Sequence, residues 1–303
     1  EDGIRDYKVT GVQTCALPIY NISINAKNFT LNGAVIQGNL TVTADGNVNV
    51  GAAGLTYVKG NLNVTNVAGT TVLGSAGNNL IITENITATG GVNSTFTAPA
   101  VANIQTKSLT VTGGTITADR VNAGVVTANG TNVTVAASPN FITPVVTVTG
   151  NGTVNVTSPG ALSTSVTNTG TGATTVNAVG ALTLNKVQVE GTAGASFTGA
   201  SVNDTAARIF VYGPASFTAT GGNVTVNRGN HSFGPVSVAA TGEATVVEDA
   251  ATQLNVVNTP KLTLTSRDYI FQAPVTGVIG STNTIITATG NITLGAAANA
   301  AGN

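Results

Sequence analysis

Few side chains in this sequence could do chemistry, and most of those that could are acids. Most of the carboxylates are solitary, and the densest group is Glu243, Glu248 and Asp249. Arg267 and Asp268 follow about twenty residues further on. Paired carboxylates beside a basic residue can exchange protons with a glycosidic bond. These five residues are therefore the catalytic candidates, although a solvated turn that discourages aggregation explains the same acids more simply, and we favour it.

His231 is the only histidine. A catalytic triad would need an activated serine and a carboxylate around it, so we interpret His231 as a turn residue in solvent. One histidine cannot build a metal site. The sequence also lacks the calcium-binding Gly-Gly-x-Gly-x-Asp repeat and the glycine-rich phosphate loop. We expect no catalytic residue, no metal and no cofactor, and hence no enzyme.

Residues 1–19 read as a translated sequencing-library adapter. The segment 9–19 matches one part of a widely used adapter, and residues 1–6 match a second part in the same frame. A fusion scar of this kind does not belong to the fold. Cys15, the only cysteine, falls inside it, so no thiol remains in residues 20–303. We expect one domain over residues 20–303, truncated at both ends.

A short phrase recurs through that domain and predicts its architecture. Glycine followed by asparagine or alanine and then apolar-polar-apolar occurs at 38–42, 60–64, 180–184, 222–226 and 290–294. A repeat of about twenty residues cannot bury a core alone, so successive repeats must stack. Alternating apolar and polar residues predict strands, and no window has helical periodicity. The sequence thus predicts an all-β, right-handed parallel β-helix (a β-solenoid) with coils of about 20 residues.

Individual strands and turns can be predicted as well. In the first part of the chain we expect strands at 21–25, 29–32, 40–42, 48–50, 55–58, 62–64 and 80–82. A longer gap near the end predicts a loop or an extra strand within 269–279. Glycine-containing pairs between strands predict turns with positive φ. These pairs are at 45–46, 77–78, 90–91, 113–114, 129–130, 151–152 and 221–222.

Charge excludes several kinds of partner. Lys and Arg number 11 against 12 Asp and Glu, the formal net charge is −1, and charged residues make up only 8% of the chain. A basic surface for nucleic acid or for anionic lipid is therefore not expected. No apolar run is long enough for a membrane-spanning helix.

The Gly-Asn-Leu-Thr-Val phrase at 38–42 and its relatives resemble the β-helical shafts of secreted bacterial adhesins, the filamentous haemagglutinin-like and autotransporter passenger proteins. The resemblance covers nearly all of residues 20–303. It implies a non-catalytic structural and binding role outside the cell or on the bacterial surface, associated with the outer membrane. The partners it implies are a host-cell or matrix surface, glycans among them, and further coils of a longer chain.

Two other functions fit a β-solenoid. One is a polysaccharide lyase or hydrolase, or a tailspike-like enzyme, that uses the region from Glu243 to Asp268. The other is ice binding, because Thr-x-Thr pairs are numerous and a flat threonine array resembles the ice-binding face of some solenoid antifreeze proteins. The spacing of the pairs drifts along the sequence, so we attribute them to the β-propensity of threonine.

Overall fold

A computed structural model describes residues 20–99, 103–137, 144–205, 208–228, 230–272, 278–294 and 300–301. The predicted adapter-derived segment 1–19 lies outside them. The chain divides into two compact units, residues 1–141 and 142–303, and each is described by itself. Within the described ranges every regular element is a β-strand.

The first unit contains fourteen strands. They are β1 (Ile22–Ala26), β2 (Phe29–Leu31), β3 (Val35–Ile36), β4 (Leu40–Ala44), β5 (Val48–Val50), β6 (Thr56–Val58), β7 (Leu62–Asn66), β8 (Thr70–Leu73), β9 (Asn79–Ile82), β10 (Asn85–Gly90), β11 (Thr95–Ala98), β12 (Asn103–Gln105), β13 (Ser108–Val121) and β14 (Val125–Ala137). The seven strands predicted for this part all exist, with ends that differ by at most two residues.

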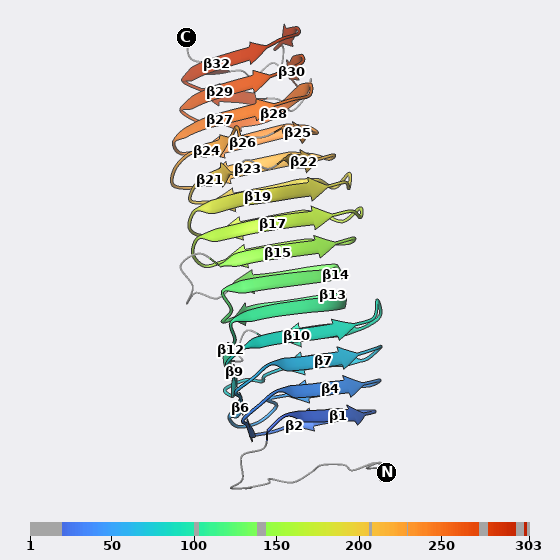
Figure 1. Cartoon of the computed structure of the whole chain (residues 1–303). Helices are drawn as coiled ribbons and strands as arrows, with labels where there is room; N and C mark the ends of the chain where they lie inside the picture. Colours follow the sequence, from blue (N-terminus) through green and yellow to red (C-terminus); the bar gives the residue numbers. More distant parts are fainter. Residues whose placement is uncertain are drawn as a thin grey trace. The chain divides into compact units, whose positions relative to one another are not determined.

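Each early coil of the first unit gives one strand to each of three parallel sheets. β1, β4, β7 and β10 lie side by side in the first (Figure 1). β2, β5, β8 and β11 form the second, and β3, β6, β9 and β12 form the third. β13 pairs with both β10 and β11, so a single strand serves two sheets.

The second unit is also built from strands that pair in parallel, with two or three strands to a coil. Its strands are β15 (Val145–Gly150), β16 (Val154–Ser158), β17 (Leu162–Asn168), β18 (Thr174–Ala178), β19 (Leu182–Val189), β20 (Ala195–Gly199), β21 (Val202–Asp204), β22 (Ile209–Val211), β23 (Ala215–Ala219), β24 (Val224–Val226), β25 (Ser232–Phe233), β26 (Val236–Ala240), β27 (Glu243–Glu248), β28 (Thr252–Asn258), β29 (Lys261–Ser266), β30 (Ile270–Gln272), β31 (Val278–Ser281), β32 (Asn283–Ala288), β33 (Ile292–Thr293) and β34 (Ala300–Ala301). β30 and β31 confirm that extra strand structure lies in the long gap.

Pairing in the second unit is again parallel and advances by about one coil. Leu162 pairs with Leu182, and Leu182 pairs with Val202, so each step is 20 residues (182 − 162 and 202 − 182). The chain is therefore an all-β parallel β-solenoid with coils of about twenty residues, as predicted. Its right-handed sense and its unity over 20–303 stay predictions.

The interior is a narrow stack of aliphatic side chains. In the first unit Leu40, Leu62, Ile86, Leu109 and Val126 occupy one register position, and each is at most 2% exposed. Strand burial alternates, as in β4, where the apolar residues point inward and the threonines outward. This alternation is what a strand with one buried face requires.

A ladder of asparagines marks one corner of the first unit. The backbone N–H of Asn39 donates to Asn21 Oδ1 at 2.8 Å, Asn61 N–H to Asn39 Oδ1 at 2.8 Å, and Asn85 N–H to Asn61 Oδ1 at 3.1 Å. The residues of each pair are 18, 22 and 24 positions apart. Coils of different length thus return to the same register at this corner.

Most glycines of the predicted turns are needed for close packing between coils and not for a positive φ. Of the glycines in the predicted pairs, only Gly77 has a positive φ, at 72°. The turn predicted at 113–114 is wrong, because both residues lie within the continuous strand β13. The turn predicted at 129–130 is wrong for the same reason, since both lie within β14. Closeness to the neighbouring coil explains such glycines: a Cβ on Gly114 would lie 2.0 Å from the carbonyl oxygen of Val92.

Candidate functional site

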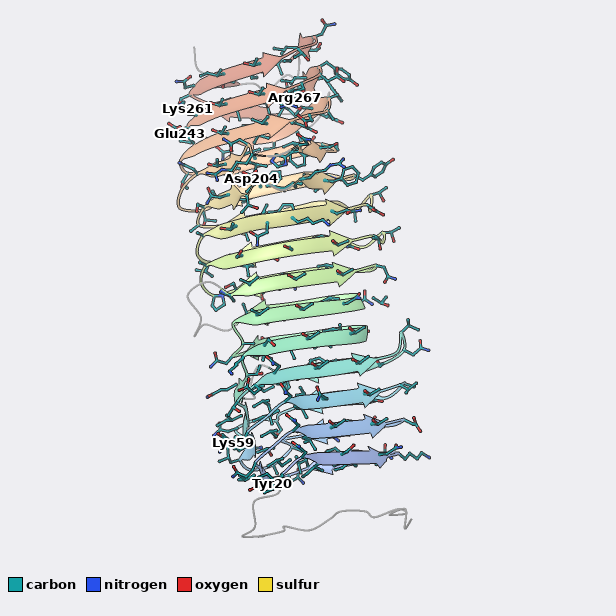
Figure 2. All side chains as sticks on the ribbon, viewed as in Figure 1. Tyr20, Lys59, Asp204, Glu243, Lys261 and Arg267 are labelled. Carbon is teal, nitrogen blue, oxygen red and sulfur yellow. The ribbon has the colours of Figure 1, made fainter. Side chains whose placement is uncertain are left out.

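Four of the five candidate residues for acid–base chemistry lie at one corner of two neighbouring coils, and Glu243 lies apart from them. Glu243 begins β27 at the surface, and the Nζ of Lys261 lies 3.1 Å from its Oε2 on the next coil. Figure 2 shows this pair at one edge of the strands and Arg267 at the opposite edge. Five residues of extended strand separate Glu243 from Glu248, which amounts to about 16 Å. Glu243 therefore cannot share a substrate bond with Glu248.

Glu248 is fully buried, which corrects the expectation of a solvated turn. Its Oε1 accepts the backbone N–H of Phe233 at 2.7 Å, and its Oε2 accepts the hydroxyl of Thr252 at 2.7 Å. Burial raises the pKa of Glu248 to about 7, although both hydrogen bonds favour the charged form. A raised carboxyl pKa is typical of general acids, but this carboxyl has no exposed surface on which a substrate could bind.

The remaining acids lie outside, at the corner that follows Glu248. Arg267 Nη1 lies 3.0 Å from Asp249 Oδ1 on the neighbouring coil. Asp268 lines a shallow hollow with Tyr269 and Phe271, whose ring centroids are 5.7 Å apart. Of the five residues, Asp249, Arg267 and Asp268 thus lie together at one corner, whereas Glu243 lies apart and Glu248 is buried.

The structure instead pairs two residues that the sequence analysis left apart. His231 is 0% exposed, so its interpretation as a turn residue in solvent is wrong. Its Nε2 lies 2.9 Å from Oδ2 of Asp204, and its Nδ1 accepts the backbone N–H of Ile209 at 3.1 Å. With Nδ1 as the acceptor for Ile209, Nε2–H is the donor to the Asp204 carboxylate.

Asp204 has two further donors. The backbone N–H groups of Asn227 and Arg228 donate to its carboxylate oxygens at 3.1 and 2.8 Å. Burial alone would raise its pKa, but the hydrogen bond from His231 and these two backbone bonds outweigh burial and lower the pKa of Asp204. The pair thus ties together the corners of two coils.

The same task falls to neutral side chains at other corners. Asn66 Nδ2 donates to Thr71 Oγ1 at 3.1 Å, and its Oδ1 accepts the N–H of Gly69. Asn168 Nδ2 donates to Thr174 Oγ1 at 3.0 Å. Glu248 and Thr252 repeat this arrangement of a strand-end residue and a threonine just beyond the corner. The buried ionisable residues therefore hold corners of the coils. Sequence analysis missed this role because nothing in the sequence indicates that these side chains are buried.

Within the described ranges, no group of three or more His, Cys, Asp or Glu residues could hold a metal ion. Those ranges also contain no helix with the length and apolar character to span a membrane.

Outward-facing threonines form a regular array on the first sheet of the first unit. We call this array the threonine face. One column holds Ser23, Thr41, Asn63, Thr87, Thr110 and Thr127, and the column two residues further along each strand holds Asn25, Thr43, Thr65, Thr89, Thr112 and Asn129. The drift in sequence spacing was therefore misleading, because the corners absorb the extra residues and the strands stay in register.

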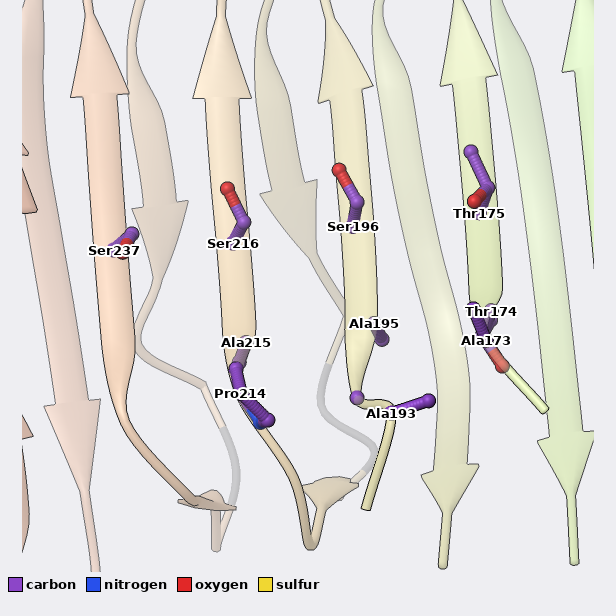
Figure 3. A pocket seen from close by; sticks show the side chains of 11 residues that line it. Ala173, Thr174, Thr175, Ala193, Ala195, Ser196, Pro214, Ala215, Ser216 and Ser237 are labelled. Carbon is purple, nitrogen blue, oxygen red and sulfur yellow. The ribbon is translucent and has the colours of Figure 1, made fainter. Parts of the chain in front are cut away.

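A smaller hydroxyl column lies on the second unit. Thr175, Ser196, Ser216 and Ser237 pair in register on four successive strands. Figure 3 shows them beside a hollow of about 200 Å³ that Pro214 also lines. Both surfaces offer rows of uncharged hydrogen-bonding groups.

Comparison of the chain with protein-family models, curated proteins and solved structures gives no match. The β-solenoid fold therefore stands on its own geometry, and function has to be argued from the surfaces and the buried groups.

Proposed function

We propose that this chain is a non-catalytic structural and binding shaft of a secreted or surface-exposed bacterial adhesin. The observation that carries the proposal is that five ionisable side chains already have hydrogen-bond or ion-pair partners within the chain. Asp204, His231 and Glu248 hold corners inside the coil, and Glu243 and Asp249 are each paired with a cation on the next coil. The threonine face and the hydroxyl column of the second unit are rows of small neutral side chains, which suit contact with a polar surface such as a glycan-covered cell or matrix.

Adhesion is tested with the full chain coupled to beads. We expect the beads to be retained on cultured host cells or on surfaces coated with matrix proteins. Beads carrying heat-unfolded chain are the matched control, because they present the same composition without the ordered faces. Equal retention of folded and unfolded chain, or no retention on any surface, would contradict the proposal.

The enzyme alternative makes a different prediction. A polysaccharide lyase or hydrolase would release new reducing ends from some member of a polysaccharide panel. The release would be abolished in Glu248→Gln and reduced in Asp249→Asn. We expect no release by the wild-type chain, and release that depends on Glu248 would overturn the non-catalytic assignment.

One observation favours ice binding as a second candidate. The threonine face repeats about every 4.8 Å from coil to coil and about every 6.6 Å along each strand, so it is a two-dimensional lattice of small hydrogen-bonding groups. None of its twelve residues is charged. Such a lattice suits a partner that also repeats in two dimensions.

Ice binding is tested by thermal hysteresis and by the shape of growing ice crystals. If the threonine face binds ice, Thr65→Lys combined with Thr89→Lys removes the activity, while Thr134→Lys on the second sheet leaves it intact. Absence of hysteresis in the wild-type chain would eliminate this candidate.

A further inference from the structure

Two cations lie side by side on neighbouring strands of the second unit. Val187 of β19 pairs with Ile209 of β22, and the N–H of Val187 donates to the carbonyl of Arg208 at 3.4 Å. Lys186 and Arg208 immediately precede those paired residues. The neighbouring strands β19 and β22 (Figure 1) therefore present the two exposed cations one coil apart, with backbones about 4.8 Å from each other.

Three cations elsewhere in the described chain differ in this respect, because each meets an acid on a neighbouring coil. The pairs are Lys107 with Glu84, Lys261 with Glu243, and Arg267 with Asp249. Within the described ranges neither Lys186 nor Arg208 forms an ion pair. Like charges opposite each other destabilise a sheet, and an uncompensated local conflict is expected where a protein binds something.

The surface between these cations is concave. A hollow of about 340 Å³ is lined by Lys186, Val187, Gln188, Glu190, Arg208 and Phe210. The guanidinium carbon of Arg208 lies 4.9 Å from the centroid of the Phe210 ring. A guanidinium stacked on an aromatic ring is held flat, and its parallel N–H groups match a carboxylate.

The other two polar residues complete a site for a sugar. Gln188 Nε2 donates to Glu190 Oε1 at 2.6 Å, so the carboxylate of Glu190 is hydrogen-bonded to an amide and not ion-paired with either cation. The amide and carboxylate oxygens of this pair can accept hydrogen bonds from hydroxyl groups. The site thus offers two cations at one side and hydroxyl acceptors at the other.

We propose that this hollow, the 186/208 groove, binds a carboxylated sugar residue of an acidic polysaccharide. The carboxylate is held by Lys186 and Arg208, and the hydroxyls of the sugar ring by Gln188 and Glu190. The inference deepens the proposed binding role by naming a ligand class for one face of the shaft, and in that sense it rests on the proposed function.

Binding is measured by titration of the full chain with three oligosaccharides. Those of polygalacturonate carry carboxylates, those of heparin carry sulfates in addition to carboxylates, and those of dextran are neutral. We expect the polygalacturonate oligosaccharide to bind and dextran not to bind. Lys186→Ala and Arg208→Ala should each weaken binding at least tenfold. Arg208→Lys should also weaken binding, because it keeps the charge but loses the planar pair of donors.

Lys261→Ala is the matched control, because it removes a cation that Glu243 already neutralises, and we expect unchanged affinity. The melting temperature gives a second readout. Loss of either cation should raise it by relieving repulsion, which also shows that the variants fold. The assignment is overturned by no binding of polygalacturonate, by binding of heparin alone, or by equal losses in Lys186→Ala and Lys261→Ala.

Failure of this inference can be told apart from failure of the proposed function. Retention of the beads on cells that survives in Arg208→Ala would keep the adhesive role and reject the groove as its ligand site. Oligosaccharide binding without retention on cells would keep the groove as a ligand site and reject the adhesive role.

Discussion

Glu248 is a buried side chain in a corner-holding position, and its charge changes near neutral pH. It accepts two hydrogen bonds inside the coil and has no cation beside it among the described residues. Its pKa of about 7 lies above the ordinary value of 4.5 because the charged form is desolvated. The unfolded chain therefore loses this proton at lower pH than the folded chain does.

From this difference we predict how stability changes with pH. Between pH 4.5 and about 7 the folded state holds one more proton than the unfolded state, so the free energy of unfolding falls as pH rises through that window and then levels off. The full loss is at most about 3 kcal/mol. Glu248→Gln keeps an acceptor for Phe233 and a partner for Thr252, so it should abolish the slope and be more stable than wild type at alkaline pH.

Urea unfolding at several pH values measures this slope. Glu243→Gln is the control, because that carboxylate is exposed and should leave the slope in place. A Glu248→Gln variant that keeps the wild-type slope would show that the buried carboxyl is not its source.

Asp204 should behave in the opposite way. Its lowered pKa means that its contribution to stability is present above pH 3.8 and is lost as pH falls through the folded-state pKa below that value. In Asp204→Asn an NH₂ group takes the place of one carboxylate oxygen. If it replaces Oδ2, it faces the donors of Arg228 and His231, and if it replaces Oδ1, it faces the donor of Asn227. We expect this variant to lose about 1–3 kcal/mol of unfolding free energy at neutral pH. Thermal unfolding checks the loss, and a variant as stable as wild type would mean that these donors find other acceptors.

At the scale of the coil, glycine permits close approach between neighbouring corners. A Cβ on Gly170 would lie 1.5 Å from the carbonyl oxygen of Asn151 on the coil before it, whereas a Cβ on Gly160 would meet nothing within 4 Å. Both glycines lie at corners of the second unit, and neither has a positive φ. Substitution of the two glycines therefore separates the effect of crowding in the folded state from the effect of restricting the backbone of the unfolded chain.

Alanine substitution distinguishes the two glycines. Gly170→Ala must displace backbone and should cost at least about 1–3 kcal/mol of unfolding free energy. Gly160→Ala should be neutral or slightly stabilising, by up to about 1 kcal/mol, because it restricts the unfolded chain. Equal effects of the two substitutions in thermal unfolding would mean that coil spacing is set by something other than these contacts.

The strands could be predicted from the sequence because each coil repeats the alternation that a half-buried strand needs. Val48–Val50 and Leu62–Asn66 show this pattern without help from distant residues. The corners could not be predicted in the same way. Whether Gly114 turns or stays extended depends on the carbonyl of Val92, and whether His231 meets water depends on Asp204, 27 residues earlier. Those contacts exist only once the register between coils is known.

At the scale of the whole chain, charge contributes little to the fold. Charged residues make up 8% of the sequence and the formal net charge is −1. The three ion pairs at the surface of the described residues are each worth about 0–1 kcal/mol. Aliphatic stacking and ladders of backbone hydrogen bonds account for the stability instead.

We therefore predict that sodium chloride has little influence on unfolding. A tenfold rise in its concentration should move the melting temperature by no more than about 3 °C, because screening acts on exposed pairs that contribute little. Circular dichroism during heating measures this shift. A large decrease in the melting temperature would show that long-range electrostatics stabilise the coils.

The asparagine ladder joins positions 18, 22 and 24 residues apart in successive coils. The gene can therefore gain or lose codons at this corner while the strands on either side stay in register. It can also gain or lose an entire coil by unequal recombination. Differences in chain length between homologues are the expected evolutionary signature. The same tolerance makes these corners suitable sites for inserting a foreign peptide at a fixed height along the coils.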